Sequence, residues 1–337
     1  MKVLFIGGTG NISTACSRVA LEQGIRVYHL NRGMTRPDVP EGITTLTADI
    51  NDSGRVRQIL NDHRFDVVLN FIAFVPGEIK RDIDLFSGRT GQYIFISSAS
   101  VYQKVGGHPV ITESTPLYNP FWQYSRDKIA CEEMLNKAYR DHGFPVTIVR
   151  PSHTYDTVIP LAIGGWKDYS IIDRMKKGKP VVIHGDGTSL WTVTHSDDFA
   201  RGFTGLLGNR QAIGHAFHIT SDEILSWNQI YEAVADAAGA GLNAVHIASD
   251  FISDFADANG REGMRGSLLG DKALSVIFDN SKIKRFVPGF QAVIPFREGI
   301  RRTLEWFESD PSRMRINKEN DAFMDLLLKA YRRETHS

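Results

Sequence analysis

Short apolar runs alternate with helical patterns along the first half of the chain. Residues 3–6 form a continuous apolar run, which is typical of a strand covered on both faces. Residues 11–23 have the spacing of a helix that stops at Gly24. Further strands are expected at residues 26–30, 66–71, 92–96 and 146–149, and further helices at 53–61, 79–86 and 122–142. This alternation predicts an α/β fold in which a parallel sheet has helices on both faces.

The alternation becomes less regular after Pro151. A helix at residues 171–177 and a strand at 181–183 lead to the turn Gly185-Asp186-Gly187. Residues 250–279 are rich in glycine and show no regular period, so we expect irregular loops that face a substrate. Later helices are expected at residues 197–207, 227–238, 295–307 and 320–332.

A glycine turn, G-G-T-G-N-I-S at residues 7–13, follows the first strand and opens the first helix. Glycines let the backbone approach phosphates closely, and the helix N-terminus supplies unpaired N–H groups and a partial positive charge. Ser13 stands in place of the usual third glycine, so helix and strand should pack slightly less closely there. We therefore expect a Rossmann-type, doubly wound sheet that binds a dinucleotide through Gly7, Gly10, Asn11 and Ile12.

The end of the second strand bears on which nicotinamide cofactor is bound. An acidic residue there would hold the ribose 2′-hydroxyl of NAD, but the sequence has Asn31 and Arg32. Arg32 can pair with a 2′-phosphate and Asn31 with a free hydroxyl, so NADP is favoured while NAD stays open. Arg32 can also be an ordinary surface charge. Asp49 is expected to end the third strand, where it either accepts a bond from the adenine amino group or serves as a turn residue.

Tyr124 and Lys128 lie four residues apart at the start of a long expected helix, and therefore on one helical face. A free phenol has a pKa near 10, and a neighbouring ammonium lowers that pKa. The pair would then exchange a proton with a hydroxyl that is becoming a carbonyl. The serine-rich end of the strand before it, residues 97–100, places hydroxyl groups at the crevice where ligands bind.

Together these motifs resemble the extended short-chain dehydrogenase/reductase family, of the NAD-dependent epimerase/dehydratase type. The matching segments also include Arg150-Pro151, Gly185-Asp186-Gly187 and residues 278–282. The resemblance implies a catalytic triad of Ser98, Tyr124 and Lys128. It also implies a homodimer formed through the helix that contains Tyr124, and further cofactor contacts from Ile50, Phe71, Ala73, Pro151 and His153.

The resemblance implies two domains as well. The dinucleotide-binding domain is expected to comprise residues 1–155 plus about 190–221. A smaller, mainly C-terminal α/β substrate domain is expected to comprise about residues 156–189 plus 222–337.

Three departures from the family's pattern bear on the substrate. Ala99 and Ser100 replace the acidic pair with which the family's dehydratases remove water. Trp191 and Leu268 stand where its epimerases have arginines that hold a substrate pyrophosphate, although Arg261 and Arg265 are near enough in sequence to substitute. Trp191 could stack on a sugar ring or be a core aromatic residue. The candidate substrate contacts are therefore Ser100, Trp191, His195 and Arg265.

Composition narrows the remaining classes of function. Lys+Arg and Asp+Glu both number 39, so net charge gives no general reason to expect nucleic-acid or membrane binding. The two cysteines, Cys16 and Cys131, indicate a reducing compartment without a disulfide framework. No apolar run suffices for a membrane span or a signal peptide, and no histidine spacing matches a metal site. A cytoplasmic protein without a metal is expected.

These observations predict an NAD(P)-dependent epimerase or oxidoreductase that acts on a secondary hydroxyl of a sugar or nucleotide sugar. A ketoreductase for a non-nucleotide substrate is one alternative. An RNA-binding or regulatory protein is another, because residues 5–13 are similar to the chloroplast stem-loop-binding protein branch. The neutral charge and the intact Tyr124–Lys128 pair favour the enzyme.

Overall fold

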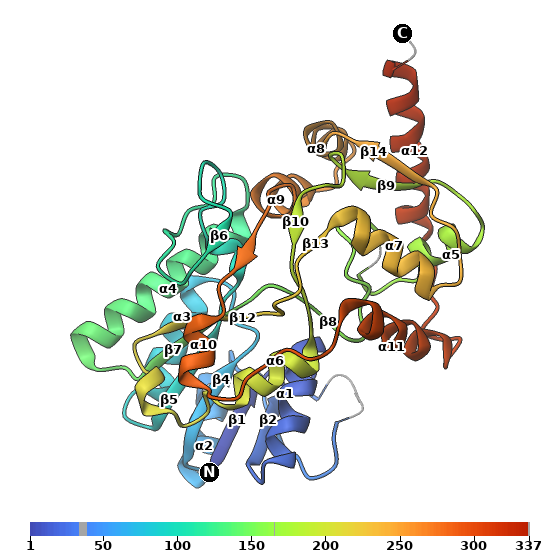
Figure 1. The fold of residues 1–337 in the computed structure, drawn as a ribbon. Coiled ribbons are helices and arrows are strands. Elements are labelled where there is room, and N and C mark those ends of the chain that lie inside the picture. The colour runs from blue at the N-terminus through green and yellow to red at the C-terminus, as the bar shows by residue number, and fades with distance from the viewer. Residues whose placement is uncertain (34–38, 165, 336–337) are drawn as a thin grey trace.

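A seven-stranded sheet forms the centre of one half of the molecule (Figure 1). The computed structural model describes residues 1–33, 39–164 and 166–335. Every neighbouring pair of strands in this sheet is parallel, which confirms the predicted Rossmann-type fold. The strands lie in the order β12 (Ala216–Ile219), β7 (Val146–Pro151), β5 (Thr90–Ile96), β4 (Phe65–Asn70), β1 (Lys2–Ile6), β2 (Arg26–Asn31) and β3 (Thr44–Thr47).

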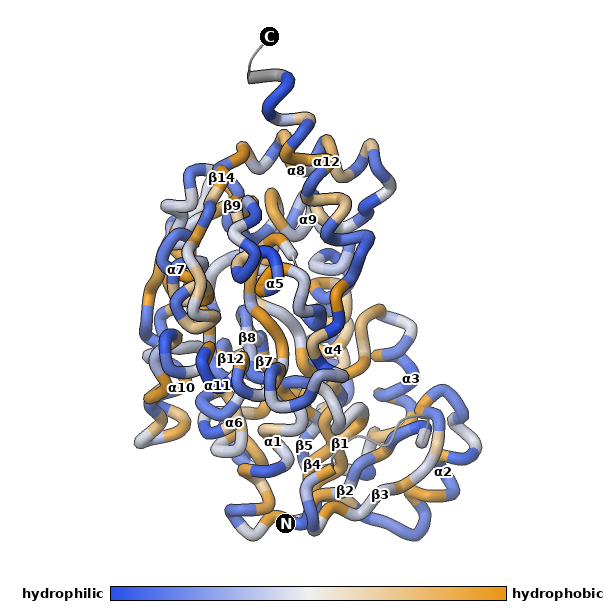
Figure 2. The backbone as a smooth tube through the Cα atoms, turned by 90° about the vertical axis from the view of Figure 1, so that its right-hand side faces the viewer, coloured by the Kyte–Doolittle hydropathy of each residue, from blue (hydrophilic) through white to orange (hydrophobic). Residues whose placement is uncertain are grey.

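Helices cover both faces of this sheet because its strand side chains alternate between two cores. Val3 and Phe5 of β1 pack with α1 (Asn11–Glu22) and α6 (Ser196–Thr204). Leu4 and Ile6 pack on the other face, which is covered by α2 (Ser53–Asp62), α3 (Pro76–Phe86) and α4 (Gln123–His142). Hydrophobic residues accordingly concentrate along the central strands (Figure 2).

The remaining elements build a further core around the fully buried Trp191 and Trp227, whose rings lie 5.6 Å apart. Its helices are α5 (Ser170–Lys176), α7 (Trp227–Ala237), α8 (Ser249–Ala258), α9 (Met264–Ser267), α11 (Phe296–Glu308) and α12 (Lys318–Thr335). Helix α10 (Ser281–Phe286) packs instead beside β12. Paired short strands complete the fold: β6 (Val110–Ile111) with β15 (Ile277–Phe278), β8 (His153–Tyr155) with β11 (Val193–His195), β9 (Val181–His184) with β14 (Ala244–Ile247), and β10 (Leu190–Trp191) with β13 (Leu225–Ser226).

The prediction of irregular loops at residues 250–279 was wrong. This segment contains α8, α9, a π-helical turn at Leu268–Lys272 and the strand β15. Ile252 and Ala256 bury one side of α8 in the further core, and this packing stabilises the helix. Gly260 and Gly263 adopt positive φ angles after it, which explains why the sequence pattern is interrupted there.

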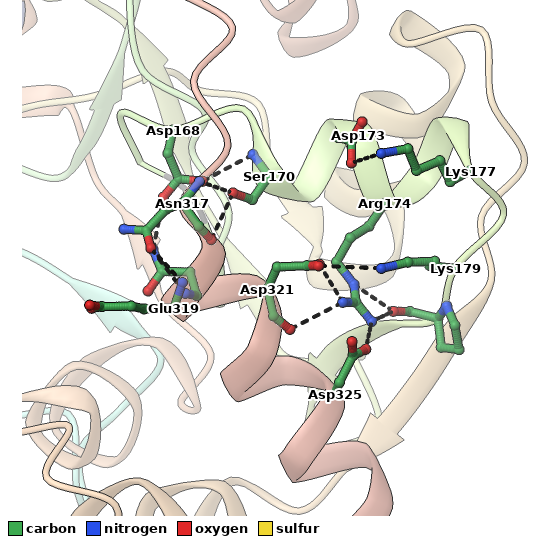
Figure 3. A network of polar contacts seen from close by, with 12 residues as sticks. Asp168, Ser170, Asp173, Arg174, Lys177, Lys179, Asn317, Glu319, Asp321 and Asp325 are labelled. Atoms are coloured by element: carbon green, nitrogen blue, oxygen red, sulfur yellow. Dashed lines mark hydrogen bonds and ion pairs between the residues drawn. The ribbon is translucent and has the colours of Figure 1, made fainter.

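A buried arginine joins α5 to α12 (Figure 3). Arg174 is 1% exposed and donates to Asp321 at 2.5 Å and to Asp325 at 2.7 Å. It also donates to the carbonyl of Pro180 at 2.9 Å. These contacts hold the C-terminal helix against the further core.

Candidate active site

A cavity of about 740 Å³ opens at the carboxyl ends of β1, β4, β5 and β7. One side is formed by the glycine turn, the loop after β4, the serine-rich end of β5 and the start of α4. The other side is formed by Leu161, Trp166 and the turn that contains Ser267, Asp271 and Lys272. Ligands bind at this edge of parallel α/β sheets, so the cavity is the candidate active site.

The glycine turn packs closely against the loop after β4. Gly7 has φ +80°, and a Cβ atom on it would lie 2.4 Å from the Ile72 side chain. Ser13, in place of the third glycine, accepts a bond from the Gly10 N–H at 2.8 Å and donates to the Gly7 carbonyl at 3.0 Å. The hydroxyl therefore closes the turn, and the first N–H groups of α1 have no partner within the helix.

Tyr124 and Ser98 both lie in this cavity. Burial raises the pKa of Tyr124, and the side chain of Ser98 partly offsets that rise. The Ser98 and Ser100 hydroxyls lie 2.9 Å apart, and Ser125 of α4 donates to Ser100 at 2.7 Å. Three serines therefore link the end of β5 to the helix that contains the tyrosine.

Lys128 is 1% exposed and donates to the backbone carbonyls of Ala73 at 2.7 Å and Ile96 at 2.8 Å. Burial lowers its pKa to about 8. Its ammonium lies 5.8 Å from the centre of the Tyr124 ring. The expected lowering of the tyrosine pKa by this ammonium is wrong for this structure, because burial of the phenol outweighs it and the ammonium bonds the backbone.

Part of the predicted cofactor set lies together in the cavity, namely Gly7, Gly10, Asn11, Ile12, Phe71, Tyr124, Lys128, Pro151 and His153. Asn11 also bonds the carbonyl of Thr154 at 3.0 Å and so joins α1 to β8. Asn31, Arg32, Asp49, Ile50 and Ala73 lie outside its lining. Asn31 ends β2 and exposed Arg32 follows it, whereas Ile50 is a core residue and Ala73 contributes its carbonyl to Lys128.

Asp49 does not end the third strand, because β3 stops at Thr47. Its carboxylate accepts the N–H of Asn51 at 2.9 Å. That contact matches the turn-residue alternative.

Of the predicted substrate contacts, Ser100 alone lines the cavity. Trp191 is fully buried against Trp227, as the core alternative expected. His195 caps α6 by accepting the N–H of Asp197 at 3.2 Å. Arg265 forms ion pairs with Asp254 and Asp257. Packing, helix capping and ion pairing thus keep these three side chains outside the cavity lining.

Sequence reasoning missed part of the cavity lining, including Trp166, Ser267, Asp271 and Lys272. The available signal was Gly270-Asp271-Lys272, which lies in the glycine-rich segment expected to face a substrate. His153, which was expected, is buried beside Trp166, with 5.0 Å between ring centres. Burial lowers its pKa to about 3, so the imidazole is neutral.

A model of the NAD-dependent epimerase/dehydratase family matches residues 3–220. The chain belongs to this family. The matched range contains the glycine turn, Ser98, Tyr124 and Lys128. Both the predicted resemblance to extended short-chain dehydrogenases and the expectation of an enzyme of this type are confirmed.

Two characterised proteins are similar in sequence to this member of the epimerase/dehydratase family. It is 24% identical over 291 residues to 2'-dehydrokanamycin reductase of Streptomyces kanamyceticus, with coverage of 86% of this chain and 80% of the reductase. It is 26% identical over 251 residues to chloroplast stem-loop binding protein of 41 kDa b of Arabidopsis thaliana. That match covers 71% of this chain and 63% of the chloroplast protein.

The fold of this family member is similar to that of UDP-glucuronic acid 4-epimerase from Bacillus cereus, solved with UDP-glucuronic acid and NAD. The TM-score is 0.72 at 18% identity, covering 92% of this chain and 99% of the epimerase chain. None of the helices within the described ranges is both long and apolar enough to cross a membrane.

Proposed function

We propose that this protein transfers hydride between a nicotinamide dinucleotide and a secondary alcohol or ketone of a carbohydrate, with Ser98, Tyr124 and Lys128 as its catalytic residues. The observation that supports the proposal most is the shared cavity, which the three side chains line together with the glycine turn. A hydroxyl, a phenol and an ammonium beside a phosphate cradle suit proton transfer coupled to hydride transfer.

The residues present fit the cofactor. The glycine turn lines the cavity, and the N-terminus of α1 offers N–H groups to a pyrophosphate. Asn11, Ile12 and Phe71 would line the cofactor's position. When bound, the nicotinamide supplies or accepts the hydride.

The side chains of the protein carry out the proton transfer. Tyr124 gives its phenolic proton to the substrate oxygen in reduction and takes it back in oxidation. Ser98 donates a hydrogen bond to the same oxygen and so fixes it near the phenol. Lys128 keeps one N–H donor after its bonds to the carbonyls of Ala73 and Ile96, and this donor would bond the ribose of the nicotinamide.

Several finer assignments belong to this proposal. We assign NADP as the preferred cofactor because exposed Arg32 follows β2 where NAD-specific proteins have an acid. We place the protein in the cytoplasm, since Cys16 and Cys131 are buried free thiols. A homodimer through α4 and the domain division at about residues 155, 190 and 221 stay predictions of the sequence.

Tyr124→Phe tests the proposal because it removes the phenolic proton and keeps the ring. We expect kcat/KM to fall by about 10²–10⁴-fold in assays of carbohydrate ketones with NADPH or NADH. The dissociation constant of the cofactor, measured by fluorescence titration, should stay near the wild-type value. Turnover close to wild type in this variant would refute the assigned role.

A further inference from the structure

A π-helical turn, Leu268–Lys272, contributes two charged side chains to the cavity wall. Asp271 and Lys272 are 7% and 8% exposed, and both line the cavity. Asp271 forms an ion pair with buried Lys104 behind the wall. The Lys272 ammonium lies 3.5 Å from Asp271 and donates to Ser267 at 3.2 Å. An ammonium has three donors, so Lys272 retains capacity for a ligand.

This turn is held in one position from behind. The carbonyl of Lys272 accepts bonds from His184 at 3.0 Å and from the Trp227 indole at 2.9 Å. The Asn119 side-chain amide donates to the carbonyls of Gly270 at 2.8 Å and Ser100 at 2.9 Å. The turn is therefore tied to the strand end that contains Ser98, and its charged groups keep a fixed distance from the proposed reaction centre.

The cavity has too few cations for a second diphosphate. Within the described ranges, its lining contains two cationic side chains, Lys128 and Lys272, and no arginine. Lys128 bonds two backbone carbonyls, and Lys272 is partly neutralised by Asp271. The nearby arginines Arg261 and Arg265 are engaged with Asn320 and with Asp254 and Asp257, outside the lining. The remaining anion site, the N-terminus of α1, is needed by the cofactor.

The same wall suits an uncharged ring. Trp122 and Trp166 contribute aromatic surface, and Leu161 adds aliphatic surface. Beside them, Lys272 and Ser267 offer donors while Asp271 offers acceptors. A sugar or polyol ring has an apolar face of C–H groups and an edge of hydroxyls, each able to donate and accept.

We propose that the substrate is a carbohydrate without a nucleoside diphosphate, and that Lys272 and Asp271 bind its ring hydroxyls. This inference rests on the proposed function and narrows its substrate class. Lys272 is assigned as a specificity-determining residue that contacts the substrate, at a distance from the proton-transfer group.

Titration of UDP and dTDP into the full chain tests the missing diphosphate site. The protein is first saturated with NADP⁺, so that the α1 N-terminus is filled, and heats are followed by isothermal calorimetry. Loss of two charge-assisted bonds weakens binding by about 10²–10⁴-fold, so we expect no saturable binding below about 1 mM. A dissociation constant below about 100 µM would overturn the inference.

A turnover screen compares free sugars, polyols and aminocyclitols with UDP- and dTDP-sugars, by following reduced cofactor. We expect activity with an unactivated compound, and Lys272→Met should raise its KM by about tenfold or more with little change in kcat. Lys272→Arg should restore part of that loss. Lys177→Met on the exposed side of α5 is the matched control and should change neither constant.

The variant is expected to fold because Asp271 keeps its pair with Lys104, and its melting temperature and cofactor affinity report whether it does. Activity confined to nucleotide sugars, or an unchanged KM in folded Lys272→Met, would overturn the inference. Absence of all turnover would count against the proposed function, whereas the UDP titration still decides the substrate class.

Discussion

Lys128 shows how burial alters the chemistry of a single side chain. Its ammonium is enclosed by Phe74 and Phe95, whose ring centres lie 4.6 and 4.8 Å away. Burial disfavours the charged form and lowers the pKa to about 8, while two carbonyls hold the group in place. A lysine of this kind changes charge within the range of ordinary enzyme assays.

The pH dependence of ketone reduction should therefore report Lys128. The charged form is present below about pH 8 and is lost above it, so kcat/KM should be level below that pH and fall above it. The Lys128→Met variant should have a low kcat/KM at every pH, and its kcat/KM should not fall above about pH 8. Initial rates between about pH 6 and 10 measure this, with Lys137→Met on the exposed face of α4 as the control. A break that persists in Lys128→Met would assign it to another group.

For single residues, the sequence predicted the position of those that contact neighbours close in the chain or that belong to a motif. Tyr124 and Lys128 lie one helical turn apart, and Ser98 follows a strand whose end must face the crevice. Trp191 and Arg265 could not be placed, because nearby aromatic and acidic partners decide where these side chains point. Lys272 could not be recognised from the sequence, because only folding brings it into the same cavity as Ser98 from far along the chain.

The attachment of α12 is the clearest case at the scale of elements. Arg174 of α5 has partners on α12 and at the start of β9, so one guanidinium fixes the relative position of several segments (Figure 3). Its acidic partners are more exposed than the arginine itself, at 25% and 55%. The arginine therefore depends on these bonds more than its partners do.

Arg174→Met should lower the free energy of unfolding by about 2–3 kcal/mol. Removing one partner of an ion pair lowers stability by more than this when both partners are buried. Here the two aspartates that lose Arg174 are partly exposed, so water can solvate them. Urea unfolding monitored by circular dichroism gives the value. Lys177→Met, which breaks the exposed pair with Asp173 on the same helix, should cost less than about 1 kcal/mol. Equal losses in the two variants would contradict the structural role.

The elements themselves were predicted best where both faces are buried. Most strands of the central sheet and its flanking helices follow simple periods, because one packing environment extends along each of them, although β12 was not predicted. The paired short strands were harder, since strands of two to four residues leave almost no period. Helix α8 was not predicted, because only one of its sides is buried and because Gly260 and Gly263 follow it closely in the sequence.

Across the whole molecule, buried histidines occur in both halves. His29 lies under the glycine turn, His153 beside the cavity and His184 behind the π-helical turn. Burial lowers their pKa values to about 4, about 3 and about 4. Each is therefore neutral in the folded protein at pH values where an unfolded chain would bind a proton.

Acid should destabilise the protein through these groups. The unfolded chain binds protons below about pH 6.5 and the folded chain does not, so stability is complete above that pH and falls below it. At pH 5 each histidine contributes up to about 2 kcal/mol of this loss. His184→Gln keeps a donor for the Lys272 carbonyl and should reduce the fall between about pH 7 and 5, as measured by urea unfolding. Exposed His142→Gln should leave the profile unchanged, and an equal change in both variants would exclude this origin.

The amide of Asn119 touches the carbonyls of Ser100 and Gly270 at once, and so bridges regions that are distant in sequence. A Cβ atom on Gly270 would lie 2.6 Å from the Asn119 side-chain oxygen, so Asn119 and Gly270 are packed too closely for any larger residue at position 270. Exchanging the turn Leu268–Lys272 for that of a relative would thus shift the strand end that contains Ser98, the proposed catalytic serine. Engineered chimaeras should take Asn119, Ser100 and Gly270 from the same parent protein. Otherwise substrate binding and the rate of turnover will change together.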